Sequence, residues 1–262
     1  MNKSSNDIRI IFFDIDGTLI DMNKKRISER MLETLIRLKE KNILLCLATG
    51  RTPLTLPRFE GVEFDAWLTF NGSYCYTREQ DIFSNPIPAD DVQTIIRNAA
   101  SIGRPVSIAS KNRLTANGKD EDLIAYYSFA KLDVEVTEDF AQVSRGEIFQ
   151  IMLGCREEDY PRLLKNTHGA RITAWWDRAA DIIPAGSGKG IGVEKILAHF
   201  HLDRAQALAF GDGNNDLEML QAVGCGVAMG NASAQLKEAA DDVCGHVADD
   251  GIYHYCAAHG LL

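Results

Sequence analysis

A short apolar run that ends in two closely spaced carboxylates constrains the fold of this chain more than any other feature. Residues 8–13 are apolar apart from Arg9, and Asp14 and Asp16 follow in the sequence DIDGTL at residues 14–19. Such a run is typical of a strand buried on both faces of a parallel sheet. Open α/β sheets bind ligands at the carboxyl ends of their strands. Two acids placed there repel each other unless a cation or a proton lies between them.

The bulk composition limits the classes of protein that this chain can represent. A length of 262 residues suits two domains, and 45% hydrophobic with 25% charged residues is ordinary for a globular protein. The net charge of −9 argues against non-specific nucleic-acid binding, which needs a basic face. It does not exclude a small anionic substrate, because a bound metal can reverse the sign of the charge locally.

Hydrophobicity and cysteine spacing point to a cytoplasmic location. No apolar run approaches the ~18 residues of a membrane span, and the polar residues 1–7 lack the core of a signal peptide. The cysteines are far apart, without a CxxC pair, as is typical of reduced thiols. They are Cys46, Cys75, Cys155, Cys225, Cys244 and Cys256. We expect a monomer or small homo-oligomer that binds neither nucleic acid nor a membrane.

Both ends of the chain alternate strands and helices, which predicts a doubly wound parallel sheet. Ser28 is the expected N-cap of a helix that Asn42 ends. The apolar face of that helix comprises Met31, Leu32, Leu35, Ile36 and Leu38. Further expected elements are strands at 43–49, 66–70, 207–210 and 226–229 and helices at 193–199 and 217–223.

Between these ends, residues 81–184 predict an inserted α+β domain. Its first element is an amphipathic helix with Val92, Ile95, Ile96, Ala99 and Ala100 on one face. Strands at 105–109 and 147–153, a polar stretch at 111–122, a helix near 160–164 and one or two strands within 172–183 follow. The chain therefore predicts a discontinuous core, residues 1–80 and 185–262, around an insert of residues 81–184.

Three later segments bring polar groups to the ends of predicted elements. Thr49 and Gly50 follow the second strand and open a helix, where a hydroxyl and free amides suit a phosphate oxygen. Lys189 lies in the glycine-rich sequence GSGKG, near a helix start. No Ser or Thr follows this lysine, as a Walker A loop would require. The sequence GDGNND at residues 211–216 adds two carboxylates and a carboxamide after a buried strand.

These four segments together favour a metal-dependent phosphoryl-transfer site. Carboxylates that converge without histidine or cysteine favour Mg²⁺ over zinc. A carboxylate, a metal, a lysine and a threonine-capped helix around one point are what phosphoryl transfer needs. Each segment also has a simpler interpretation. Thr49 can belong to an ordinary turn, Lys189 can be a solvated lysine, and the acids of residues 211–216 can cap a helix.

The motifs resemble those of the haloacid dehalogenase-like hydrolase superfamily, specifically its Cof-type phosphatases of subfamily IIB. The resemblance rests on residues 12–19 (FFDIDGTL), 48–51 (ATGR), 70–72 (FNG), 188–190 (GKG), 209–216 (AFGDGNND), 219–220 (ML) and 227–232 (VAMGNA). The insert lies where that subfamily carries its α/β cap. The resemblance implies a Rossmann-like α/β core with an inserted α+β cap of the C2B type that selects the substrate.

The resemblance also implies a role for each motif residue. Asp14 is the implied nucleophile, which forms an aspartyl-phosphate, and Asp16 the acid that protonates the leaving alcohol and then deprotonates water. The implied phosphate-binding groups are Thr49, Lys189, Asn215 and the amides near Ile15 and Gly50. The implied Mg²⁺ ligands are Asp14, the backbone carbonyl of Asp16 and Asp212, while Asp216 supports the metal or Lys189.

Several alternatives remain open from sequence. A dehalogenase is disfavoured because those enzymes do not keep the second acid, Asp16, whereas a phosphomutase or a non-catalytic regulator stays possible. Sugar phosphates are the favoured substrates, followed by FMN, pyridoxal phosphate and nucleotide monophosphates. In the insert, Trp176, Arg178, Lys111 and Arg113 are candidates for substrate contact, whereas we expect Trp175 to pack within the insert.

Overall fold

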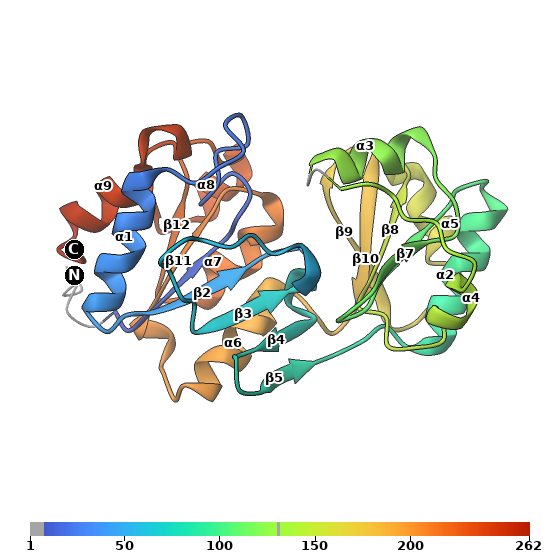
Figure 1. Ribbon diagram of the computed structural model, residues 1–262, viewed down its shortest axis with the longest axis horizontal. Helices are drawn as coiled ribbons and strands as arrows, with labels where there is room; N and C mark the ends of the chain where they lie inside the picture. Colours follow the sequence, from blue (N-terminus) through green and yellow to red (C-terminus); the bar gives the residue numbers. More distant parts are fainter. Residues whose placement is uncertain (1–7, 130–131) are drawn as a thin grey trace. The chain divides into compact units, whose positions relative to one another are not determined.

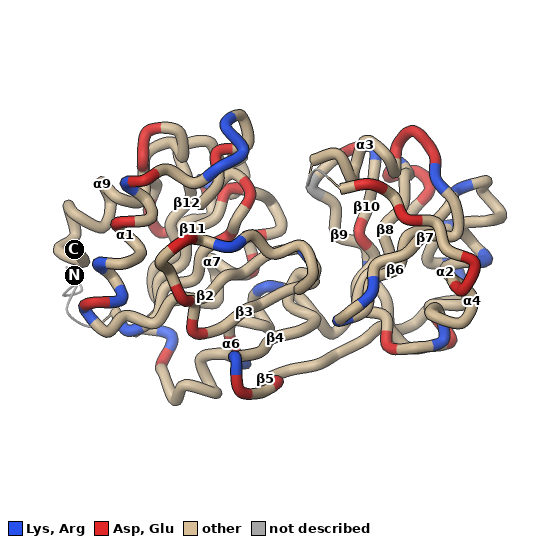
Figure 2. Tube along the Cα trace, in the orientation of Figure 1, with Lys and Arg blue, Asp and Glu red and all other residues tan. Residues whose placement is uncertain are grey.

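The computed structural model describes residues 8–129 and 132–262, and only the backbone of Trp175, so the expectations for residues 1–7 and for the Trp175 side chain lie outside the described residues. The chain forms two compact units (Figure 1). The core unit comprises the residues through Gly50, Pro57–Phe83 and Gly188–Leu262, and the insert unit comprises Arg51–Leu56 and Ser84–Ser187. Figure 2 shows Lys and Arg interspersed with Asp and Glu in both units.

The core unit is built on an eight-stranded sheet with the order β13-β12-β11-β1-β2-β3-β4-β5. Strand β1 lies in the middle and pairs in parallel with β11 and β2, which places the carboxyl ends of all three strands at one edge. The strands are β1 (Ile10–Phe13), β2 (Leu44–Ala48), β3 (Ala66–Thr69), β4 (Tyr74–Tyr76), β5 (Asp81–Ser84), β11 (Ala207–Gly211), β12 (Cys225–Ala228) and β13 (Asp242–Val243). The predicted doubly wound parallel sheet is confirmed.

The first helix of the core unit, Glu29–Glu40, begins at a serine cap. The Ser28 hydroxyl accepts a hydrogen bond of 3.0 Å from the backbone N–H of Met31, as expected of an N-cap. Ile36 is 38% exposed, so the expectation that it shares the buried face is wrong. At 100° per residue it lies far around the helix from Met31. The helices are α1 (Glu29–Glu40), α6 (Lys189–His199), α7 (Leu217–Ala222), α8 (Ala234–Ala239) and α9 (Gly251–Ala258).

The insert unit is an antiparallel sheet with the strand order β7-β6-β8-β10-β9. Val92 and Ile95 of the helix Ala89–Ser101 share one buried apolar cluster with Ile151 of this sheet. The strands are β6 (Ser107–Ala109), β7 (Leu114–Ala116), β8 (Gln150–Gly154), β9 (Ala170–Trp176) and β10 (Ala179–Pro184). The helices are α2 (Ala89–Ser101), α3 (Glu121–Phe129), α4 (Phe140–Val143) and α5 (Tyr160–Leu163). The predicted α+β insert is confirmed.

Two local predictions differ from the structure. The polar stretch 111–122 contains β7, a three-residue strand at the edge of the sheet, and the first turn of α3. A short edge strand has too few apolar residues to show a period. Strand β5 belongs to the core sheet, so the insert unit begins at Ser84 rather than at residue 81.

The described residues include neither a membrane-spanning helix nor a disulfide bond. Within residues 8–129 and 132–262, no helix combines the length and the hydrophobicity that crossing a bilayer needs. None of the six cysteines, all of which the structure describes, forms a disulfide bond.

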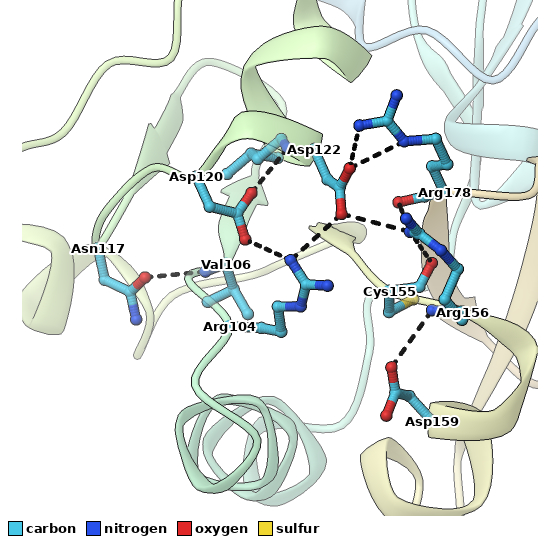
Figure 3. A network of polar contacts seen from close by, with 10 residues as sticks. Arg104, Val106, Asn117, Asp120, Asp122, Cys155, Arg156, Asp159 and Arg178 are labelled. Carbon is cyan, nitrogen blue, oxygen red and sulfur yellow. Dashed lines mark hydrogen bonds and ion pairs between the residues drawn. The ribbon is translucent and has the colours of Figure 1, made fainter.

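A network of three arginines around Asp122 joins several elements of the insert unit (Figure 3). Asp122, in the first turn of α3, is 6% exposed. Arg178 donates a hydrogen bond of 2.5 Å to its Oδ1, and the guanidinium groups of Arg156 and Arg104 lie 3.3 and 3.2 Å from its Oδ2. Burial alone would raise the pKa of Asp122, but the hydrogen bond from Arg178 and the three positive charges lower it.

We expect Asp122→Asn to destabilise the protein by about 2 kcal/mol, the scale of losing hydrogen bonds to a charged group. Because the pKa is lowered in the folded state, this stabilisation is present above the unfolded carboxyl pKa of about 4 and is lost as the pH falls below it. Urea denaturation of the variant should therefore depend less on pH than that of the wild type in this acid range.

The matched control is Asp139→Asn. Asp139 pairs with Arg113 at 2.9 Å, but both side chains are more than 40% exposed (42% and 43%). An exposed, solvent-screened ion pair contributes little to stability, so this variant should remain close to the wild type. Equal losses of unfolding free energy in the two variants would contradict a special role for the Asp122 network.

Candidate active site

Three carboxylates meet at the carboxyl edge of the core sheet. Asp14 follows β1 directly, and its backbone N–H donates to the Phe210 carbonyl at 3.0 Å, which continues the pairing of β1 with β11. Asp212 and Asp216 belong to the segment after β11. Carboxylate oxygens of Asp14, Asp212 and Asp216 all lie within 4.8 Å of one another. The structure thus brings together residues that are about 200 positions apart in the sequence.

Lys189 lies between two of these acids. It is the first residue of α6 and is 1% exposed. Its ζ-nitrogen donates to Oδ1 of Asp14 at 2.7 Å and to Oδ1 of Asp216 at 2.5 Å. The second oxygen of Asp216 accepts hydrogen bonds of 3.0 Å from the backbone N–H groups of Asp212 and Gly213. Both carboxylate oxygens of Asp216 accept hydrogen bonds within the protein. These contacts favour a role in holding Lys189 and the turn at Asp212 over a role as a metal ligand.

Asp212 is oriented by residues for which the sequence suggested no role. The Thr18 hydroxyl donates to Oδ1 of Asp212 at 2.9 Å. The Asn231 amide donates to the Gly17 carbonyl at 2.7 Å and lies 3.5 Å from Oδ2 of Asp212. Gly17 has a φ of +91°, and a Cβ there would lie 2.2 Å from Asp212 Oδ2. Thr18 and Asn231 lie in the motifs at residues 12–19 and 227–232, and this membership was the only sign in the sequence that they belong to the site.

The site carries more negative than positive charge. Burial raises the pKa of Asp14 well above its ordinary value, against the opposing charge of Lys189. Burial and the charge of Asp216 raise the pKa of Asp212 to about 7. Burial alone would lower the pKa of Lys189, but the charges of Asp14 and Asp216 hold it above its ordinary value. One ammonium group does not balance the charge of three ionised carboxylates, so this cluster favours binding of a further cation.

The donor set of this cluster fits a magnesium ion. Carboxylate oxygens that converge without histidine or cysteine are typical ligands of a hard divalent cation. Within the described residues, the cluster comprises Asp14, Asp212 and Asp216, and the Asp16 carboxylate is not a member of it. Asp16 is half-buried two residues after the predicted nucleophile.

The remaining predicted phosphate-binding residues lie at the ends of β1, β2 and β11. Thr49 is 2% exposed, and its backbone N–H donates to the Leu68 carbonyl at 2.9 Å. Ile15 is fully buried after β1, and Gly50 follows Thr49. Asn215 donates from Nδ2 to Oδ1 of Asn71 at 3.2 Å. Asn71 follows β3 and lies in the quoted motif at residues 70–72, to which the sequence assigned no role.

One expected feature of this region is wrong. Thr49 and Gly50 do not open an α-helix, because only a three-residue 3₁₀ helix, Pro53–Thr55, follows them. Pro53 and Pro57 remove backbone N–H groups and restrict the residues before them, which prevents a regular helix here. Gly50 therefore lies at no α-helix N-terminus that could supply free amides.

The candidate substrate residues of the insert contact other parts of the insert unit. The Arg178 guanidinium, which binds Asp122, also lies 5.1 Å from the centre of the Trp176 ring. Arg113 pairs with Asp139, and the Lys111 ammonium lies 5.7 Å from the centre of the Phe149 ring. Both arginines thus have acidic partners within the insert unit.

A family model described as haloacid dehalogenase-like hydrolase matches residues 11–256. The chain belongs to the haloacid dehalogenase-like hydrolases. It is 32% identical over 262 residues to the Bacillus subtilis (strain 168) protein named "Putative phosphatase YkrA", across 98% of this chain and 99% of the relative. The 5-amino-6-(5-phospho-D-ribitylamino)uracil phosphatase YitU of Bacillus subtilis (strain 168) is 29% identical over 260 residues, which are 94% of this chain and 95% of YitU.

The solved structures include a similar member of this hydrolase family. The HAD subclass IIB sugar phosphatase BT4131 superposes with a TM-score of 0.88 at 29% identity, across 97% of this chain and 100% of BT4131. The family resemblance seen in the sequence is confirmed, and so is the α/β core with an inserted cap. The family and its named phosphatases identify the chain as a hydrolase of phosphoric monoesters.

Proposed function

We propose that this hydrolase is a Mg²⁺-dependent phosphatase of small phosphorylated metabolites that works through an aspartyl-phosphate on Asp14. The observation that carries the proposal is Lys189, a buried cation held 2.7 Å from Asp14 beside two further carboxylates. Sugar phosphates are the first substrate class, supported by the sugar phosphatase BT4131 as a structural relative. FMN, pyridoxal phosphate and nucleotide monophosphates follow. We propose that the reaction takes place in the cytoplasm.

In the first half-reaction, an oxygen of Asp14 attacks the substrate phosphorus. The bond between phosphorus and the ester oxygen breaks, and Asp16 gives its proton to the departing alkoxide. The products of this step are the free alcohol, a phosphoryl group bonded to Asp14 and an ionised Asp16.

In the second half-reaction, Asp16 takes a proton from water as the water oxygen attacks phosphorus. The bond between phosphorus and the Asp14 oxygen breaks, which releases inorganic phosphate and restores both acids. One side chain serves as acid and then as base, because each half-reaction leaves it in the protonation state that the other needs.

The groups around Asp14 hold and neutralise the phosphoryl oxygens. Lys189 supplies a permanent positive charge, because Asp216 and Asp14 hold it protonated. Further donors are the Thr49 hydroxyl, the amide of Asn215 and the backbone amides of Ile15 and Gly50. Asp14, Asp212 and the backbone carbonyl of Asp16 would hold Mg²⁺, which would supply positive charge to an anionic phosphoryl group.

The insert unit, most of which is Ser84–Ser187, is the proposed substrate-selecting cap. The core groups bind phosphate alone and do not distinguish one monoester from another. Selection then depends on the part of the substrate beyond the phosphate.

The test is phosphate release from a panel of phosphomonoesters, with Mg²⁺ and with EDTA. We expect release from several sugar phosphates with Mg²⁺ and a loss of at least about 100-fold on chelation. Equal rates with and without EDTA would overturn the metal requirement. No release from any substrate by folded, Mg²⁺-loaded protein would move the function to a phosphomutase or a regulator.

A further inference from the structure

The turn that follows β3, Phe70–Gly72, has an uncommon backbone conformation. Three successive residues have positive φ angles: 51° at Phe70, 52° at Asn71 and 90° at Gly72. Residues other than glycine rarely adopt this conformation, and a bulky residue such as Phe does so least readily. Strained backbone of this kind persists only where surrounding contacts fix it, and it concentrates at functional sites.

This turn contacts two of the elements that carry proposed phosphate-binding groups. The backbone N–H of Asn71 donates to the Thr49 carbonyl at 3.1 Å. A Cβ on Gly50 would lie 3.0 Å from both the nitrogen and the oxygen of the Asn71 amide. A Cβ on Gly72 would lie 2.1 Å from the carbonyl oxygen of Gly188, the residue before Lys189. The turn therefore packs against the Thr49 turn and the start of α6 without space for added atoms.

The side chain of Asn71 reaches a third element. It is 4% exposed, and its Oδ1 accepts the hydrogen bond of 3.2 Å from Nδ2 of Asn215. An amide nitrogen carries two N–H bonds, so this contact occupies one and leaves the other for a phosphoryl oxygen. The same hydrogen bond fixes the orientation of the Asn215 amide, because its nitrogen rather than its oxygen must face Asn71.

We propose that Asn71 is a positioning residue for phosphate binding: its amide orients Asn215, and its backbone ties the Thr49 turn to the same point. This inference rests on the proposed function, since it assumes that Asn215 and Thr49 bind phosphate. Asn71 acts through Asn215 and is not itself assigned to the reacting atoms. If the side chain served only to tolerate the left-handed backbone, glycine would replace it without loss.

Asn71→Gly separates these two roles. Glycine keeps the backbone conformation free of strain and removes the amide. We expect kcat/KM to fall about tenfold, the effect of about one lost hydrogen bond in the transition state, while the thermal midpoint stays within about 4 °C of the wild type. A matched control is Asn42→Gly, since Asn42 also has a left-handed φ, 59°, after α1. It should leave kcat/KM unchanged.

A double-mutant cycle with Asn215→Ala decides whether Asn71 acts through Asn215. In the Asn215→Ala background, Asn71→Gly should change kcat/KM less than about twofold, because residues that act as a unit are not additive. A full tenfold loss in that background would overturn the positioning role. Wild-type rates in Asn71→Gly would overturn it as well.

Binding of inorganic phosphate, measured by calorimetry on the Mg²⁺-loaded proteins, gives a readout that does not need turnover. Asn71→Gly, Asn215→Ala and the double variant should all bind phosphate about tenfold more weakly than the wild type. If the wild type releases no phosphate from any ester, the proposed function fails, yet this binding series still tests the coupling. Additive losses in affinity would overturn the inference while the phosphatase assignment stands.

Discussion

Asp14→Asn should abolish phosphate release, with a loss of at least about 10⁴-fold in kcat, because an amide does not attack phosphorus as a carboxylate does. The replacement has nearly the same shape, and its oxygen can still accept from Lys189, which lies 2.7 Å from Asp14 Oδ1. The fold should therefore survive. Acid-quenched reactions of the wild type with substrate should contain protein-bound phosphate, and those of the variant none. Near-normal turnover in Asp14→Asn would eliminate the aspartyl-phosphate mechanism.

Asp65→Asn is the matched control for this experiment. Asp65 precedes β3, at the opposite edge of the same sheet, where it accepts hydrogen bonds from Lys39 at 2.6 Å and from the backbone N–H of Leu45 at 2.8 Å. An asparagine there weakens an ion pair but touches none of the proposed machinery. The variant should keep wild-type kcat once corrected for its folded fraction. A comparable loss of corrected kcat in Asp65→Asn would show that the effect of Asp14→Asn is not specific to the proposed nucleophile.

The parts of the fold that follow from local chemistry were accessible from sequence. Buried parallel strands such as β1 appear in the sequence as apolar runs, and an N-cap residue such as Ser28 indicates where a helix begins. The carboxyl edge of a parallel sheet then collects whatever follows each strand, so Asp14 and Asp212 could be expected near each other. Their catalytic roles came from the resemblance and remain predictions.

Features that depend on tertiary contacts were not accessible. The edge strand β7 is held by its pairing with β6 rather than by its own hydrophobicity. Asp216 was assigned to the metal or to Lys189, and only the contacts of its two oxygens favour the second role. Asn71 lies in the quoted motif at residues 70–72, but nothing local assigns it a role, because its side chain contacts Asn215, a residue 144 positions away.

Lys189→Met should lower kcat/KM by about 10³-fold, the scale for removing a preorganised charge from a buried phosphoryl site. Methionine fills similar space without a charge, so Asp14 and Asp216 lose the cation that separates them. Leaving buried charges unpaired should also lower the free energy of unfolding by about 3 kcal/mol. The two effects are distinguished by measuring rates well below the unfolding midpoint and normalising them to the folded fraction.

Lys195→Met on the same helix provides the control. Lys195 is exposed, and its ammonium group lies 5.4 Å from the centre of the Phe83 ring. An exposed cation–π contact contributes about 0.5–1 kcal/mol, so both stability and kcat/KM should stay near the wild type. If Lys189→Met keeps more than about a tenth of the wild-type kcat/KM, the buried lysine serves to balance charge in the fold. Neutralisation of the phosphoryl group would then have to come from the other donors.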